Sequence, residues 1–159
     1  MEVGSQWYNR IVAEITQYEY TLGQKEAKRY KLDLLRRVAK RVDDFSNTCA
    51  ECQTHQQEIT RLVQELSLLT QMPSKQGLKS HTRAVSTPVE HLKKVHKLVE
   101  KGHYLGMGVG IGWVIGAAIG GALGAAFDNP GIGTGVGIAL GVAVGMYLDR
   151  KAEREGRVI

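Results

Sequence analysis

The side chains of this 159-residue sequence that could most directly do chemistry are two cysteines and a nearby histidine. Cys49-Ala50-Glu51-Cys52 is a Cys-x-x-Cys motif, and His55 follows three residues later. A redox site needs an exposed thiol of lowered pKa, and a zinc site needs four ligands, usually from two separated pairs. Both cysteines fall on apolar positions of a helical repeat, so we interpret them as small buried hydrophobic residues. Redox chemistry and a metal site assembled from several chains stay open.

No other motif predicts catalysis or cofactor binding. The five histidines, at positions 55, 81, 91, 96 and 103, show no spacing that we interpret as a metal cluster. The sequence contains no phosphate-binding loop and no Gly-x-Ser-x-Gly motif. We therefore expect that the protein is not an enzyme, with no catalytic residue, no cofactor and no metal ligand.

The cysteines belong to a strict three-four alternation of apolar residues that predicts a coiled coil or a helix-bundle seam. We expect a helix near 5–22 and a longer one near 25–71, either separate or continuous through a kink. Gln56 is the polar member of the alternation, and such residues often fix helix register. Residues 1–72 are thus predicted to form a cytosolic long-helical coiled-coil region. The seam residues are Leu35, Val38, Val42, Phe45, Cys49, Cys52, Gln56, Ile59, Val63 and Leu66.

Two further segments connect this region to the C-terminal half. Residues 73–87 are polar and predict a linker. Thr87, Pro88 and Glu90 have the types and spacing of a helix start, so we expect a basic amphipathic juxtamembrane helix over 88–103. Basic residues here and after the last apolar segment are expected to contact lipid headgroups. These residues are Lys93, Lys94, Lys97, Lys101, Arg150 and Lys151.

A second basic stretch, over 25–41, has eight basic and two acidic residues. We interpret it as a solvated helix face. Lipid headgroups come next among its expected partners, and nucleic acid is unlikely.

Glycine dominates the C-terminal half. Fifteen of the 19 glycines lie between Gly102 and Gly145, and Asp128 is the one charged residue between Tyr104 and Leu148. Residues 104–127 and 131–148 predict two transmembrane helices joined by a turn at 128–130. Six glycines of the first coincide with six of the second at an offset of 25, and four-residue spacing places small residues on one helix face. The packing glycines are Gly108, Gly112, Gly116, Gly120, Gly124, Gly133, Gly137, Gly141 and Gly145.

Charge around this hairpin predicts its orientation. The chain carries a formal net charge of +5, and basic residues flank both apolar segments while the turn has none. The positive-inside rule then places both termini, including a basic tail over 149–159, on the cytoplasmic side of the inner membrane.

The hairpin resembles the glycine-zipper transmembrane hairpins of small bacterial membrane proteins. The resemblance rests on the Gly-x-x-x-Gly runs, the Asp-Asn-Pro-Gly turn and the basic tail, and it covers about a third of the chain. It implies a membrane hairpin. It leaves function open, since such hairpins occur in anchors, oligomeric scaffolds and pore-forming proteins.

The sequence therefore predicts an all-α integral membrane protein with a cytosolic helical domain. We expect a homo-oligomer that contacts the lipid bilayer, as a pore-forming or membrane-perturbing effector. The alternative is a membrane anchor or adaptor that recruits a cytosolic protein partner through residues 1–72.

Overall fold

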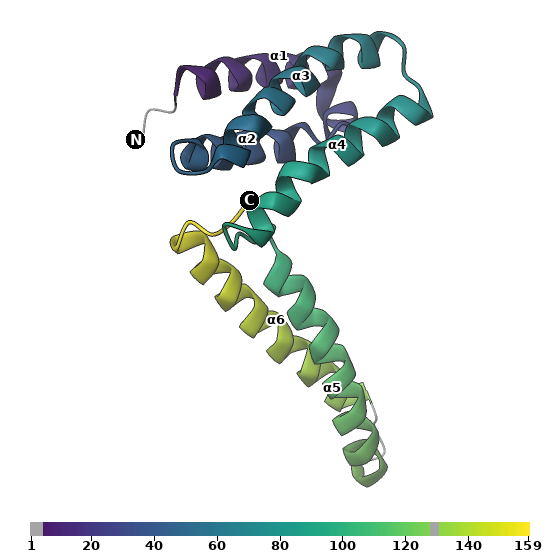
Figure 1. Ribbon diagram of the computed structural model, residues 1–159. Helices are drawn as coiled ribbons and strands as arrows, with labels where there is room; N and C mark the ends of the chain where they lie inside the picture. The colour runs from purple at the N-terminus through teal and green to yellow at the C-terminus, as the bar shows by residue number, and fades with distance from the viewer. Residues whose placement is uncertain (1–4, 128–130) are drawn as a thin grey trace. The chain divides into compact units, whose positions relative to one another are not determined.

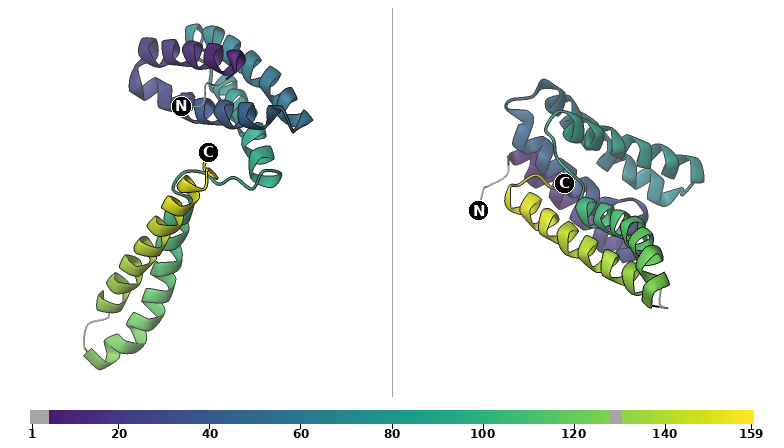
Figure 2. Two further views of the ribbon diagram at one scale, coloured as in Figure 1. Left: turned by 90° about the vertical axis from the view of Figure 1, so that its left-hand side faces the viewer. Right: turned by 90° about the horizontal axis from the view of Figure 1, so that it is seen from below.

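The computed structural model describes the backbone of residues 5–127 and 131–159 and the side chains of residues 5–119 and 134–159. The described residues form six α-helices and no strand beyond one isolated bridge, which confirms the all-α prediction. The chain divides into two compact units (Figures 1 and 2). The helical unit ends at Lys97 and also includes Ile159, and the hairpin unit is Leu98–Val158.

The helical unit is built around α2 (Leu32–Ser46), which contacts α1 (Gln6–Arg29), α3 (Ala50–Gln71) and α4 (Lys75–Lys94). Apolar residues recur on α2 at helical spacing, and burying them against three neighbours supplies the driving force for the fold. The fully buried side chains of the unit include Ile11, Ile15, Leu32, Leu35, Val38, Val42, Ile59, Val63, Leu66, Val85 and Leu92.

The chain breaks the predicted long helix twice, so the prediction of one coiled-coil helix over 25–71 is wrong. The first break follows Tyr30, where Lys31 adopts a left-handed conformation (φ 54°, ψ 37°) and ends the run from α1. The second precedes α3, where Cys49 is extended (φ −134°, ψ 113°). The three-four alternation of apolar residues continues across the second break because α2 and α3 both contribute side chains to one core. The helices therefore form a bundle and not a coiled coil.

α4 occupies the predicted linker and also overruns the predicted helix start at Thr87. The helix begins after Ser74, whose hydroxyl accepts a hydrogen bond from the Gly77 amide at 2.9 Å. Such a cap satisfies one of the free amides of the first turn. Pro88 therefore lies inside α4, and the helix ends at Lys94, nine residues before the predicted end at 103.

His81 connects α4 to the first helix break. Its side chain is buried, and Nε2 donates a hydrogen bond to the carbonyl oxygen of Tyr30 at 3.1 Å. Burial lowers the pKa of His81, which favours the neutral ring. The break at Tyr30 thus leaves a carbonyl group that α4 satisfies.

The hairpin unit consists of α5 (His103–Phe127) and α6 (Gly131–Arg154), whose backbones touch through glycine. A Cβ atom built on Gly112 would lie 2.5 Å from the carbonyl oxygen of Gly137, and Cβ atoms on Gly108 and Gly141 would overlap the carbonyl oxygen of the opposite residue. A Cβ atom on Gly145 would lie 2.6 Å from the carbonyl oxygen of Tyr104. Only glycine permits this approach.

Polar contacts close the open end of the hairpin. The carboxylate of Asp149 accepts hydrogen bonds from the backbone amides of Tyr104 and Leu105, at 3.1 and 2.9 Å. These amides start α5, where a negative charge is favourable. The Val99 amide donates to the carbonyl oxygen of Arg157 at 2.8 Å. α6 continues to Arg154, so about half of the predicted tail is helical.

Across the described residues, no helix combines the length and the apolar character that a bilayer crossing requires. This finding overturns the predicted glycine-zipper transmembrane hairpin, the inner-membrane localisation and both membrane functions, pore and anchor. Glycine contributes no apolar side chain, so a glycine-rich helical turn gains less free energy on transfer to lipid than a leucine-rich turn. The C-terminal part of α6 also carries three charged residues, Asp149, Arg150 and Lys151. The turn at 128–130 lies outside the described residues, and Gly120, Gly124 and Gly133 lie outside the described side chains.

The expected contact of six basic residues with lipid headgroups stays a prediction. The six basic residues lie on α4 (Lys93, Lys94), between α4 and α5 (Lys97, Lys101) and on α6 (Arg150, Lys151).

We expect Gly141→Ala to destabilise the hairpin unit by about 1–3 kcal/mol, because the added methyl group overlaps the carbonyl oxygen of Gly108. Gly110→Ala is the matched control. A Cβ atom there meets nothing within 4 Å, so the better helix former should stabilise α5 by up to about 1 kcal/mol. Amide hydrogen exchange of α5 and α6 measures both changes. Equal protection in the two variants would refute the close glycine contact.

Candidate metal centre

Four side chains of the helical unit converge on one point. They are Cys49, Cys52, His91 and His96, and one ligand atom from each lies within 4.8 Å of the other three. The His91 Nε2 atom is 3.4 Å from the Cys49 Sγ atom and 3.5 Å from the Cys52 Sγ atom. The His96 Nε2 atom is 3.4 Å from the Cys52 Sγ atom.

Helix ends position all four residues. Cys49 is the N-cap of α3 but its thiol makes no capping hydrogen bond, and Cys52 lies in the first turn. His91 lies in the last turn of α4, and His96 follows the C-cap residue Val95. α3 packs against α4, so the start of one and the end of the other meet. The α3 N-terminus also favours negative charge, which suits thiolate ligands.

The distances match the requirements of a tetrahedral zinc ion. With Zn–S bonds near 2.3 Å and Zn–N bonds near 2.0–2.1 Å, tetrahedral geometry places sulfur and nitrogen about 3.6 Å apart. The three sulfur–nitrogen distances are 3.4, 3.5 and 3.4 Å. Two thiolates and two imidazoles are a ligand set that zinc favours.

Neighbouring residues hold both imidazoles in the orientation that a metal needs. The Glu51 Oε2 atom lies 2.6 Å from the His91 Nδ1 atom, so Nδ1 carries the proton and Nε2 faces the cysteines with its lone pair. The His96 ring stacks on Phe45, with centroids 3.9 Å apart and planes inclined by 16°. Phe45 lies in the last turn of α2, so three helix ends surround the centre.

In the metal-free cluster the Cys52 thiol and the His96 ring both favour their neutral forms, so metal binding would displace the thiol proton. Burial raises the pKa of Cys52 to about 12, and Cys49 and Glu51 act in the same direction. Burial and the neighbouring His91 lower the pKa of His96, which favours the neutral ring that metals bind. A divalent cation would supply the positive charge that stabilises the thiolate form.

This ligand arrangement fits a structural metal site better than a catalytic one. Four protein ligands fill a tetrahedral ion and leave no position for a water molecule or a substrate. A buried thiol of raised pKa is also a poor nucleophile, which disfavours the redox interpretation of the Cys-x-x-Cys motif.

Only part of this site was expected from the sequence. We expected no metal ligand, yet both cysteines meet two histidines from the same chain, without the several chains that we considered necessary. His55 is not among the four; its Nδ1 atom lies 2.7 Å from Glu58 Oε2. The missed signal was the spacing Cys-x2-Cys and His-x4-His, which fits zinc sites. The 38 residues between the pairs concealed it.

No protein-family model, curated protein or solved structure matches this chain. The interpretation of the centre therefore rests on its own geometry.

We expect Glu51→Gln to weaken zinc binding about tenfold, because the carboxylate orients the His91 ring. Glu58→Gln is the matched control, since Glu58 contacts a histidine outside the cluster. Competition against a chromophoric zinc chelator measures both affinities. The proposed role of Glu51 is refuted if the two variants bind zinc equally well.

Proposed function

We propose that the helical unit is a zinc-stabilised module with a structural or binding role and no catalytic one. The observation that supports this is the convergence of Cys49, Cys52, His91 and His96 within 4.8 Å. Zinc is favoured over calcium or magnesium because those ions require oxygen ligands. A closed site of four protein ligands is typical of structural zinc.

The proposed ion would link two segments that lie at or beyond helix ends and are only partly buried in the apolar core. His96 lies beyond the end of α4, and its ring contacts the cluster and Phe45. Cys49 lies in the short connection between α2 and α3. Zinc binding would therefore contribute directly to the folding free energy of the unit, because the unfolded chain lacks a preformed site.

We expect the purified full-length chain to contain about one zinc ion per molecule. Cobalt substitution should give the intense visible absorption of a tetrahedral site with sulfur ligands. Cys52→Ser and His96→Asn each remove a ligand atom and should abolish the cobalt spectrum at equimolar metal. His55→Gln removes a neighbouring histidine that is not a ligand and should leave the spectrum unchanged.

Chelation gives a second measurement that does not depend on the cobalt spectrum. Excess chelator should lower the thermal midpoint of the helical unit in the wild-type chain and in His55→Gln, and should leave Cys52→Ser unaffected. A metal-free chain that keeps its full stability, or a cobalt spectrum that depends equally on His55, would refute the proposal.

A second proposed property is self-association through the hairpin unit. Large apolar side chains of its described part are exposed, including Trp113 at 58%, Leu140 at 64% and Tyr147 at 67%. Many large exposed apolar side chains on one unit are uncommon in monomers and are typical of an interaction site. Glycines 106 and 135 have no atom within 4 Å of a built Cβ, so a second copy could approach these backbones.

Sedimentation velocity in aqueous buffer tests this second proposal. We expect a concentration-dependent species larger than the monomer. Combining Trp113→Gln with Leu140→Gln should weaken association about tenfold or more, because each change removes buried apolar area from the interface. Tyr20→Gln, which changes a side chain of the helical unit that is 92% exposed, is the control. A wild-type protein that stays monomeric at all concentrations would contradict the proposed self-association.

A further inference from the structure

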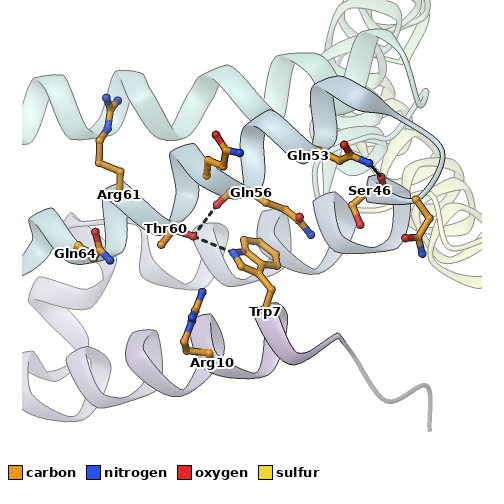
Figure 3. A pocket seen from close by; sticks show the side chains of 10 residues that line it. Trp7, Arg10, Ser46, Gln53, Gln56, Thr60, Arg61 and Gln64 are labelled. Carbon is orange, nitrogen blue, oxygen red and sulfur yellow. Dashed lines mark hydrogen bonds between the residues drawn. The ribbon is translucent and has the colours of Figure 1, made fainter.

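A polar groove runs along the helical unit between α1 and α3, and none of the four proposed zinc ligands is among its lining residues (Figure 3). Its volume is about 610 Å³, within the range of ligand-binding sites. Trp7 and Arg10 line it from α1, and glutamines and Arg61 line it from α3. Among the described residues that line the groove, two are arginines and none is Asp or Glu. The Arg61 guanidinium also lies 3.6 Å from the Glu65 carboxylate, but such an exposed pair is weak and leaves other N–H groups of Arg61 for a second carboxylate.

The floor of the groove is preorganised. The Trp7 Nε1 atom donates a hydrogen bond to Thr60 Oγ1 at 2.9 Å, and the Thr60 hydroxyl donates to the Gln56 carbonyl oxygen at 2.8 Å (Figure 3). These bonds hold the half-buried indole ring in one position. A fixed aromatic ring offers contact area at low entropic cost.

Glutamine amides line the α3 side of the groove. Gln53 Nε2 donates to the Ser46 carbonyl oxygen at 2.9 Å, and Gln56 Nε2 donates to Asp43 Oδ1 at 3.2 Å. Within the described part of the chain, no other partner of these two amides is present, and the side-chain amides of Gln57 and Gln64 make no hydrogen bond. An amide side chain can donate to and accept from a peptide backbone at the same time.

The dimensions fit a short extended segment. Gln53, Gln57 and Arg61 follow one four-residue row of α3, and Gln56, Thr60 and Gln64 follow the next. The eleven residue steps from Gln53 to Gln64 correspond to about 16 Å along the helix axis. An extended peptide of about five residues has this length.

We propose that this groove binds an extended acidic peptide segment of a partner protein. Arg10 and Arg61 pair with its carboxylates, the glutamine amides pair with its backbone, and the Trp7 ring packs against an aliphatic side chain. A nucleic acid would require a longer series of cations along its phosphates, so the peptide fits the two arginines better. This site is separate from the zinc proposal, because none of the four proposed ligands lines it.

Fluorescence anisotropy with the zinc-loaded full-length chain tests the proposal. The probe is a fluorescein-labelled Glu-Glu-Ile-Glu-Glu peptide, compared with the peptide in which Gln replaces each Glu. We expect saturable binding of the acidic peptide, at least about tenfold tighter than that of the neutral one. Arg10→Gln and Arg61→Gln should each weaken binding about fivefold.

Arg83→Gln on α4 is the matched control, since it removes the same charge from an exposed position outside the groove. Its affinity should stay within about twofold of wild type, and circular dichroism and zinc content should be unchanged in all three variants. The groove proposal is overturned by absence of saturable binding, by an equal loss in Arg83→Gln, or by tighter binding of a single-stranded oligonucleotide that depends on the same two arginines. The zinc proposal would survive each of these outcomes.

Discussion

The helical unit depends on one constraint, which is that the start of α3 and the end of α4 meet at the same point. Cys49 and Cys52 come from the first of these helix ends, and His91 and His96 come from the second. Phe45 adds the end of α2 through its stacked contact with His96. An ion at this point would fix the rotation of α3 about its own axis. That rotation also decides which side of α3 faces α1, and therefore where the glutamine rows lie.

The hairpin unit obeys a different constraint, because its helices approach through backbone atoms. Any side chain at Gly108 or Gly141 would occupy the space of a carbonyl oxygen on the opposite helix. The apolar side chains are consequently displaced to the outer surfaces, where Trp113 and Leu140 are more than half exposed. Close glycine contact and exposed apolar side chains are thus two consequences of one composition, and the exposed side chains support the proposed association with another copy.

The sequence predicted periodic features well and predicted tertiary ones poorly. The three-four alternation identified Leu35, Val38, Ile59 and Val63 as core, because burial follows helical period. It could not locate the breaks at Lys31 and Cys49, since neither carries the glycine or proline that marks a helix end. Pro88 has the sequence signature of a helix start, yet it lies inside a helix that begins after the N-cap Ser74.

The candidate metal centre also depends on tertiary packing that the sequence pattern did not predict. Each half of the site has a zinc-like spacing, but the 38 intervening residues form most of α3 and α4, and only their packing brings the halves together. The proposed ion would be neutralised by two thiolates, so the centre would add no net charge to the unit. The cationic side chains that line the groove are Arg10 and Arg61, and Arg61 is also paired with Glu65. The proposed ion would contribute to the folding of the helical unit, and selectivity for a ligand would reside in the groove.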